Sequence, residues 1–153
     1  MNLKSREILF MARRENYKTK IKDKWLVEGY PFINGEHCVI MKSMEVAEGK
    51  ERLGKPVMNS YCTNVERETV SQYTGREDMN GKKIWEYSIV RVIYDGIEHY
   101  LVVIFDSEEN DFKAVNSLEG YSTFAYLGTC EEIEVMDHLF YYEDIEEVLK
   151  QLH

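Results

Sequence analysis

Two short stretches of the sequence have the spacing of ligand-binding loops, and each lacks a residue that the chemistry requires. Gly49 to Pro56 reads GKERLGKP, with the glycines and lysine of a phosphate-binding loop. That loop needs a Ser or Thr after the lysine to bind magnesium, and Pro56 stands there instead. Asp78 to Gly81 reads DMNG, as in part of a calcium loop, but Arg76 and Tyr87 would fill its first and last ligand positions. Neither Arg76 nor Tyr87 supplies a carboxylate. We therefore reject the calcium loop for this reason and the phosphate-binding loop because of Pro56.

Nucleophiles and metal ligands show no useful spacing either. The four histidines are scattered along the chain: His37, His99, His138 and His153. The three cysteines, Cys38, Cys62 and Cys130, form no CxxC motif and are typical of small buried apolar residues. No serine lies in a nucleophile-elbow context. We therefore predict no catalytic residue, no metal site and no cofactor, and expect a protein that is not an enzyme.

Length and composition narrow the class of protein. The 153 residues suit one domain, so we predict a single domain over residues 1–153. No apolar run approaches the roughly 18–20 residues of a membrane span, and the N-terminal apolar stretch is too short for a signal peptide. An odd number of cysteines indicates reduced thiols, which predicts a cytoplasmic protein.

The net charge of −9 is spread unevenly along the chain. Residues 1–25 hold eight Lys/Arg and three Asp/Glu, whereas residues 95–153 hold two and fifteen. This asymmetry predicts that the two ends attract each other, within one chain or between subunits. Binding of a polyanion to the basic end is the weaker alternative, because an acidic body repels phosphate.

The first part of the chain contains several strand patterns. Residues 6–13, REILFMAR, form a short apolar run that predicts a buried strand. Residues 17–25 alternate as an extended chain would, with one face typical of a solvated edge. That face would carry Lys18, Lys20, Lys22 and Lys24. Asn34-Gly35 predicts a hairpin between two apolar segments, and the polar residues 42–60 predict a loop.

The second part of the chain is strongly β from residue 84. Asp95-Gly96 separates two apolar runs and predicts the clearest hairpin of the sequence. Short strands with turn signals about every 8–12 residues follow. Ile145, Val148, Leu149 and Leu152 then recur at helical spacing, which predicts a helix over residues 143–152.

The fold class follows from these elements. We predict an all-β fold, a pseudo β-barrel of short antiparallel strands and hairpins with a C-terminal α-helix. Asn80-Gly81 should reverse the chain into a strand over residues 84–94. The residues assigned to structural turns are Asn34, Gly35, Gly75, Asn80, Gly81, Asp95 and Gly96.

The stretch at residues 68–92, ETVSQYTGREDMNGKKIWEYSIVRV, resembles the YopX family of phage and prophage proteins. The family pattern resembles QYTGL-D-NGK-I-EGDIV. It is matched by Gln72, Tyr73, Thr74, Gly75, Asp78, Asn80, Gly81, Lys82, Ile84, Glu86, Ile89 and Val90. Residues 6–18 and 130–149 are similar to the family's opening and closing segments. Tyr87-Ser88 replaces a usual Gly-Asp, and Arg13 replaces an aromatic residue.

The resemblance implies a β-barrel-like fold and homo-oligomerisation, and it assigns no activity. We therefore expect a non-catalytic, homo-oligomeric interaction or assembly module of a phage or prophage, in the cytoplasm of the bacterial host. Its partner would be another copy of the chain, or a further phage or host protein. The surface that we predict for a partner comprises Lys18, Lys20, Lys22, Lys24, Arg76 and Lys83.

A nucleic-acid-binding accessory protein is the alternative function. Five aromatic residues, Tyr73, Trp85, Tyr87, Tyr94 and Tyr100, lie near Arg76, Lys82, Lys83 and Arg91 in the sequence. Aromatic rings among basic residues on a small β-barrel can stack single-stranded bases. The same rings are more typical of a core and of cross-strand pairs, and the acidic composition also disfavours nucleic acid.

Overall fold

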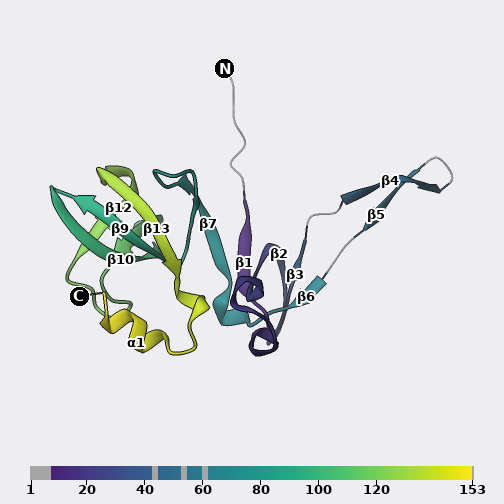
Figure 1. The fold of residues 1–153 in the computed structure, drawn as a ribbon, viewed down its shortest axis with the longest axis horizontal. Coiled ribbons are helices and arrows are strands. Elements are labelled where there is room, and N and C mark those ends of the chain that lie inside the picture. The colour runs from purple at the N-terminus through teal and green to yellow at the C-terminus, as the bar shows by residue number, and fades with distance from the viewer. Residues whose placement is uncertain (1–7, 43–44, 53–54, 60–61, 153) are drawn as a thin grey trace, which may run out of the picture. The chain divides into compact units, whose positions relative to one another are not determined.

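The computed structural model describes residues 8–42, 45–52, 55–59 and 62–152, and for residues 45–52 and 55–59 it describes the backbone alone. The fold is mostly β, with antiparallel sheets of six, five and two strands and one short α-helix (Figure 1). The described residues divide into two compact units: a first unit within residues 9–70, and a second unit of residues 71–152 together with Ile8.

The first unit contains four strands of the six-stranded sheet, in the order β6-β3-β2-β1. Its strands are β1 (Phe10–Arg13), β2 (Leu26–Asn34), β3 (His37–Met41) and β6 (Cys62–Asn64). The hairpin predicted at Asn34-Gly35 joins β2 to β3, with Asn34 opposite His37 and a φ of 62° at Gly35. The core of this unit consists of Ala12, Val27, Cys38, Ile40 and Val65.

The prediction of an extended segment over residues 17–25 is wrong. The chain instead forms two 3₁₀ turns, η1 (Tyr17–Thr19) and η2 (Lys22–Lys24). The Trp25 indole donates to the Lys20 carbonyl at 3.0 Å and its ring contacts the buried Tyr17 ring, which curls the segment. The four lysines are exposed, but they do not form one row along a strand.

Arg13 is buried and connects β1 to other parts of the first unit. Its Nε atom donates to Glu66 at 2.6 Å, and its guanidinium lies 4.2 Å from the centre of the Tyr17 ring. Its backbone N–H donates to the Thr69 hydroxyl in η3 (Arg67–Thr69) at 2.8 Å. These bonds connect β1 to the end of the first unit.

A two-stranded ribbon replaces most of the loop predicted over residues 42–60. Strands β4 (Glu45–Arg52) and β5 (Lys55–Asn59) pair antiparallel, with a register shift between Val46 and Glu51. Such a ribbon needs backbone pairing alone, so the polar composition that suggested a loop does not prevent it.

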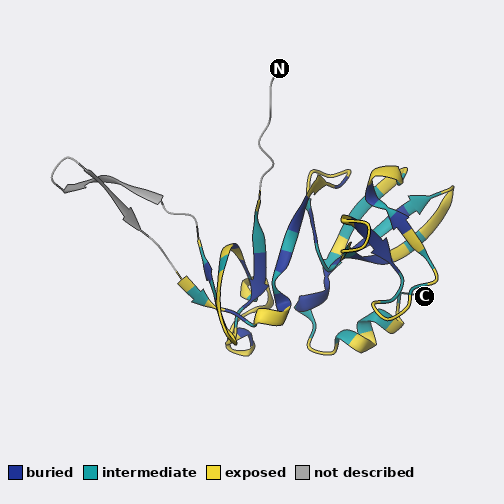
Figure 2. Cartoon of the chain, turned by 180° about the vertical axis from the view of Figure 1, so that it is seen from behind, coloured by how far each residue is buried: buried dark blue, intermediate teal, exposed yellow. Residues whose placement is uncertain are grey.

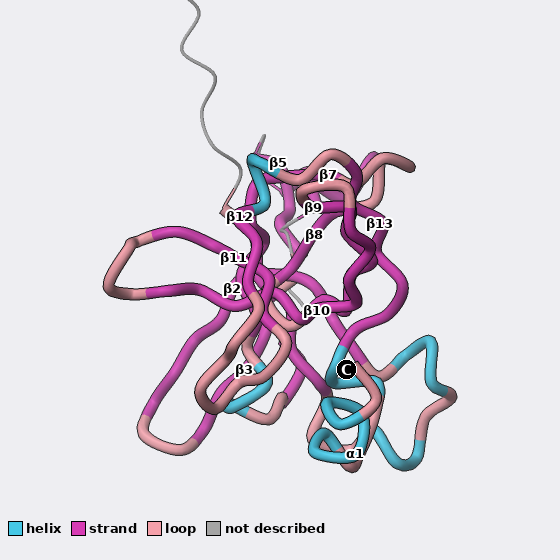
Figure 3. Tube along the Cα trace, turned by 90° about the vertical axis from the view of Figure 1, so that its left-hand side faces the viewer, coloured by secondary structure: helices cyan, strands magenta, loops and turns pink. Residues whose placement is uncertain are grey.

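The second unit contains a hairpin and a five-stranded antiparallel sheet with order β12-β11-β10-β9-β13 (Figure 3). The hairpin consists of β7 (Ser71–Glu77) and β8 (Lys83–Trp85). The sheet strands are β9 (Ser88–Tyr94), β10 (Ile97–Asp106), β11 (Asp111–Val115), β12 (Phe124–Tyr126) and β13 (Glu132–His138). Asp95-Gly96 joins β9 to β10, with Tyr94 opposite Ile97 and positive φ at both turn residues.

Both faces of the five-stranded sheet carry buried apolar residues (Figure 2). Ile84 of β8 packs with one face, alongside Val90, Val92, Leu101 and Val103. Val102, Val115 and Leu139 on the other side contact helix α1 (Ile145–Lys150) through Ile145, Val148 and Leu149. Alternating side chains on a strand point to opposite faces, which explains the two clusters.

Short 3₁₀ turns precede and follow β13, namely η4 (Leu127–Thr129) and η5 (Leu139–Tyr141). Helix α1 lies within the predicted range 143–152 and is shorter than it, and the Asp144 carboxylate caps it by accepting the Glu147 N–H at 3.1 Å. No helix among the described residues is long and apolar enough to cross a membrane.

The predicted pseudo β-barrel is not closed in the described part of the chain. In the five-stranded sheet, β12 pairs with β11 alone and β13 pairs with β9 alone, so both are edge strands. The sequence pattern gives strand number and alternation, but closure depends on shear and tilt, which the pattern does not encode. The assignment of residues 1–153 to a single domain stays a prediction.

Candidate functional site

The turn between β7 and β8 is organised by the carboxylate of Asp78. Its Oδ1 atom accepts the N–H of Asn80 at 2.8 Å and that of Lys82 at 2.9 Å. The backbone closes the same turn, because the Asp78 N–H donates to the Lys82 carbonyl and the Gly81 N–H donates to the Asp78 carbonyl. Gly81 has the positive φ of the turn, at 80°. The DMNG motif is thus a carboxylate-capped turn.

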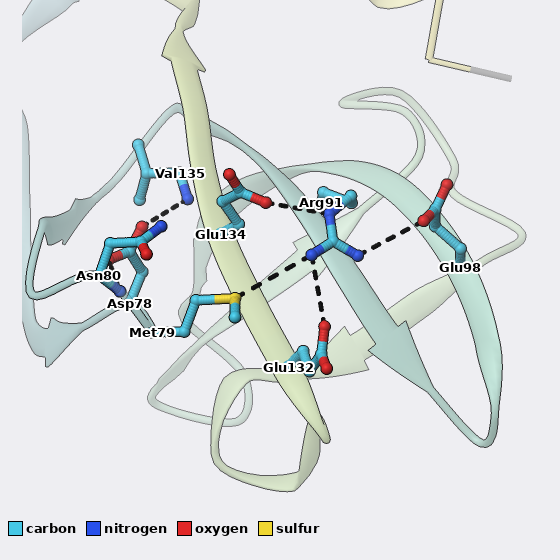
Figure 4. Close-up of polar contacts among 8 residues, drawn as sticks. All are labelled: Asp78, Met79, Asn80, Arg91, Glu98, Glu132, Glu134 and Val135. Atoms are coloured by element: carbon cyan, nitrogen blue, oxygen red, sulfur yellow. Dashed lines mark hydrogen bonds and ion pairs between the residues drawn. The ribbon is translucent and has the colours of Figure 1, made fainter.

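The same carboxylate attaches this turn to β13. Its Oδ2 atom accepts the Val135 N–H at 2.8 Å (Figure 4). The Met79 N–H also donates to the Ile133 carbonyl at 3.0 Å. Burial of the Asp78 side chain raises its pKa, but the backbone N–H donors of Val135, Lys82 and Asn80 outweigh this and leave the pKa lowered. Asp78 is therefore a buried, charged connector between two elements.

Gly75 was predicted in a turn and lies instead inside β7, with a φ of 83°. The β7–β8 register shifts between Tyr73 and Glu77, so Gly75 provides the backbone conformation of an irregular strand. Thr74 stabilises the irregularity, because its hydroxyl donates to the Ile84 carbonyl at 2.7 Å and accepts the Arg76 N–H at 3.2 Å.

Arg91 of β9 contacts three glutamates on the outer side of the sheet. The distances from its guanidinium to Glu134, Glu132 and Glu98 are 3.1, 3.3 and 3.4 Å. Figure 4 shows that Met79 reaches from the Asp78 turn to the same guanidinium. The hydrogen bonds that Arg91 donates to Glu134 and Glu132 raise its pKa. The cluster leaves one arginine to neutralise three acids, and it crosses β9, β10 and β13.

Tyr87 and Ser88, which replace a Gly-Asp pair of the pattern that the sequence resembles, lie where the turn after β8 leads into β9. Tyr87 adopts a φ of 65°, a conformation that glycine reaches without steric cost. Its N–H donates to the Val103 carbonyl at 2.7 Å and its ring contacts Phe140, which hold it in place. The Ser88 hydroxyl accepts the Trp85 N–H at 2.9 Å, so an oxygen acceptor is still present at that position.

His138, at the end of β13, is buried and neutral. Its Nδ1 atom accepts the Phe140 N–H at 3.2 Å, so the proton lies on Nε2, which donates to the Glu86 carbonyl at 3.0 Å. Burial lowers its pKa from 6.5 to about 4, against smaller opposing effects of the Glu86 carbonyl and Asp137. Burial raises the pKa of the Glu86 carboxyl, which accepts the Gln72 N–H at 3.0 Å.

We expect the fold to lose stability between pH 7 and pH 5 because of His138. In this range the unfolded chain protonates His138, whereas the folded chain does so only near pH 4. The linkage predicts a loss of about 2 kcal/mol by pH 5. Denaturation midpoints at both pH values measure it. His138→Gln should remove this pH dependence, whereas the matched variant His99→Gln should keep it. The raised pKa of Glu86 has the opposite effect, because it adds stability as the pH falls. If His138→Gln lost as much stability between pH 7 and pH 5 as the wild-type protein, the assignment to His138 would be contradicted.

A cavity of about 620 Å³ lies beside the β7–β8 hairpin. Four of its lining residues come from β7 and four from the hairpin between β10 and β11. They are Gln72, Thr74, Gly75 and Arg76, and Phe105, Asn110, Asp111 and Phe112. Strand β7 therefore forms one wall of a cavity. The turn that follows β7 is hydrogen-bonded to β13.

The residues predicted for a partner surface fall into two groups in different units. Lys18, Lys20, Lys22 and Lys24 belong to the first unit, and Arg76 and Lys83 belong to the second. Within the second group, Arg76 lines the cavity, whereas the Lys83 ammonium lies 5.7 Å from the centre of the Tyr73 ring. Their use as a partner surface stays a prediction.

The aromatic residues considered for base stacking are mostly in the interior. Tyr73 and Trp85 are buried and contact each other at a ring distance of 5.5 Å, and Tyr87 and Tyr94 are half-buried. Tyr100 is the exposed member of the five. These positions favour the interpretation of the rings as core and cross-strand pairs.

Sequence reasoning missed several residues of this region. Arg91 and Glu98 could have been found, because the tight Asp95-Gly96 turn sets a register that places them diagonally on one face. The contacts of Arg91 with Glu132 and Glu134 depend on the pairing of β13 with β9, which no local pattern predicts. The same holds for Phe105 and Asp111 beside β7.

The fold and this region define a mostly β protein. Its residues 71–92 contain a carboxylate-capped turn that is hydrogen-bonded to the edge strand β13. The chain belongs to the YopX protein family, whose family model matches residues 11–138. The match extends over most of both units, and it confirms the resemblance seen in residues 68–92. A comparison with the curated proteins gave no match.

Proposed function

We propose that this YopX family protein is a non-catalytic interaction module of a phage or prophage that assembles with copies of itself in the bacterial cytoplasm. The observation that carries this proposal is an apolar face on the β2–β3 hairpin. Tyr30 lies opposite Met41 and Phe32 lies opposite Val39, so these four side chains point to one face. Tyr30 and Phe32 are 48% and 59% exposed.

An exposed apolar patch on a β-sheet is typical of an interaction surface. The opposite face of the same hairpin packs Cys38 and Ile40 into the core, so the outer face is not needed to stabilise the unit. A second copy is the occupant that we favour, because the basic residues 1–25 and the acidic residues 95–153 would attract each other between two chains.

The hydrogen bonds of polar side chains within residues 71–92 support a role without catalysis. Asp78, Thr74 and Ser88 each hydrogen-bond to backbone atoms within the fold. The His138 ring is likewise occupied by the Phe140 N–H and the Glu86 carbonyl. Groups held in this way stabilise turns and strands, which supports a structural role for them.

We expect the wild-type protein to self-associate and the double variant Tyr30→Glu/Phe32→Glu to dissociate. Burying a Phe side chain contributes about 1.5–3 kcal/mol, so the dissociation constant should rise at least about tenfold. Size exclusion with light scattering over a range of concentrations, at low and high salt, measures this change. Association that weakens with salt would identify the contribution of the charge asymmetry.

Ile21→Glu is the matched control, because Ile21 is 69% exposed in the same unit and lies outside the β2–β3 face. It should self-associate like the wild-type protein. Circular dichroism of all variants verifies that the fold is retained. A wild-type protein that remains monomeric at high concentration, whatever the salt, would refute the proposal.

A further inference from the structure

The cavity beside β7 is lined by two side chains of opposite charge that do not pair with each other. Arg76 provides a guanidinium and Asp111 a carboxylate. In the part of the chain that the structure describes, neither forms an ion pair, whereas Arg91 and Lys113 of the same unit both do. Both residues are exposed, so their charged groups are accessible to a ligand that carries both charges.

Gly128, in η4, lies beside the end of the Arg76 side chain. A Cβ added at Gly128 would lie 3.0 Å from the Arg76 Nη2 atom and 3.5 Å from its Cζ atom. Gly128 does not have the left-handed φ that favours glycine, so its backbone conformation does not explain the residue type. The contact locates the Arg76 guanidinium next to η4.

The remaining lining residues add polar and apolar contacts. The Asp111 carboxylate is held by the Phe112 N–H, which donates to Oδ1 at 2.8 Å. Phe105 is 40% exposed, and its ring packs edge-on against Phe112 at 5.1 Å. Gln72 and Asn110 contribute amide groups that both donate and accept. The cavity volume of about 620 Å³ exceeds what one small ion needs and falls in the usual range for ligand sites.

We propose that this cavity binds a zwitterion of the amino acid type, either a free amino acid or a short peptide. Its carboxylate would bind the planar Arg76 guanidinium, which matches carboxylate geometry. Its ammonium would donate to Asp111, and an apolar side chain would contact Phe105. This site lies in the second unit and does not depend on self-association through the first, so either proposal can fail alone.

Titrations followed by ¹H–¹⁵N NMR test this site in the full chain. The probes are L-phenylalanine and the dipeptide Phe-Phe, which distinguish a free amino acid from a peptide. N-acetyl-L-phenylalanine lacks the ammonium, and L-phenylalaninamide lacks the carboxylate. We expect saturable shifts at the Thr74 and Phe112 amides with at least one zwitterionic probe, and about tenfold weaker binding of its singly charged analogues.

Charge variants assign each end of the ligand. Arg76→Gln should remove the preference for a free carboxylate over its amide, and Asp111→Asn should remove the preference for a free ammonium over its acetyl derivative. The exchange Arg76→Asp/Asp111→Arg should regain part of the zwitterion binding. Lys83→Gln, on the same hairpin but outside the cavity lining, should bind like the wild-type protein.

Three results would overturn this assignment. The first is the lack of saturable shifts with either zwitterionic probe up to its solubility limit. The second is equal binding of the uncharged N-acetyl-L-phenylalaninamide. The third is binding of inorganic phosphate that depends on Arg76 while zwitterion binding is independent of Asp111, which would define a simple anion site.

Discussion

Replacing Asp78 with Asn should lower the free energy of unfolding by about 2–3 kcal/mol, because a buried charged acceptor loses its hydrogen bonds. The Asp78 side chain accepts two backbone N–H groups on Oδ1 and a third on Oδ2, and the residue is only 8% exposed. An Asn side chain has one acceptor oxygen. If that oxygen serves Asn80 and Lys82, the amide N–H₂ group faces the Val135 N–H, and two donors meet in a buried position.

Urea denaturation followed by the fluorescence of Trp85, in a Trp25→Phe background, measures this loss in the second unit. Asp95→Asn is the matched control, since Asp95 lies in an exposed turn where Asn tolerates the φ of 54°. It should change stability by no more than about 0.5 kcal/mol. An Asp78→Asn protein as stable as Asp95→Asn would show that the carboxylate does not anchor the turn.

The Asp78 contribution also has its own pH range. Its pKa is lowered in the fold, so the contribution is present above the unfolded value of about 3.9 and is lost as the pH falls through the folded value. The effect of His138 lies at higher pH, between about 4 and 6.5. A stability profile from pH 7 to pH 3 should therefore show two separate losses.

Gly29→Ala should destabilise the first unit by about 3 kcal/mol or more, as expected for overpacking against a rigid neighbour. A Cβ at Gly29 would lie 2.2 Å from the Met41 carbonyl oxygen and 2.7 Å from the Ile40 Cγ2 atom. The nearest atom belongs to the backbone of the paired strand, so it cannot move without shifting β3 away from β2. The clash thus acts on the hairpin that presents Tyr30 and Phe32.

Hydrogen exchange measured by mass spectrometry locates this effect. Peptides from residues 26–41 should exchange much faster in Gly29→Ala, whereas Glu28→Ala, at the adjacent exposed position of the same strand, should leave them protected. Unchanged protection of residues 26–41 in Gly29→Ala would mean that the strand accommodates a side chain there, contrary to the geometry.

Short sequence patterns predicted the two tight hairpins and the terminal helix, because neighbouring residues determine these elements. The hairpins at Asn34-Gly35 and Asp95-Gly96 follow from turn chemistry, and the terminal helix follows from a change of period. The prediction of an extended segment over residues 17–25 was wrong, because the alternating lysines have the period of a strand. The contact between Tyr17 and Trp25 determines the conformation there instead. The order of the strands, and the open edges of the five-stranded sheet in the described part of the chain, depend on pairings between distant strands.

The candidate site shows the same division. The sequence indicated that residues 71–92 are unusual and that DMNG is not a calcium loop. The role of Asp78 could be predicted only in part, because an Asx-type turn is local but its bond to Val135 is not. The opposite wall of the cavity comes from residues 105–112, so nothing near Arg76 in the sequence indicates Asp111 as its counterpart.

The bond from Val135 to Asp78 spans 57 positions of the chain. A ribosome that has just released the signature turn still has to add β9 through β13 before the donor of that bond exists. Until then the Asp78 carboxylate remains without its third partner, and loop closure over this distance is entropically costly. The turn of residues 78–82 therefore gains its third hydrogen bond only after Val135 has been added, and shortened chains that end before Val135 should leave that turn without it.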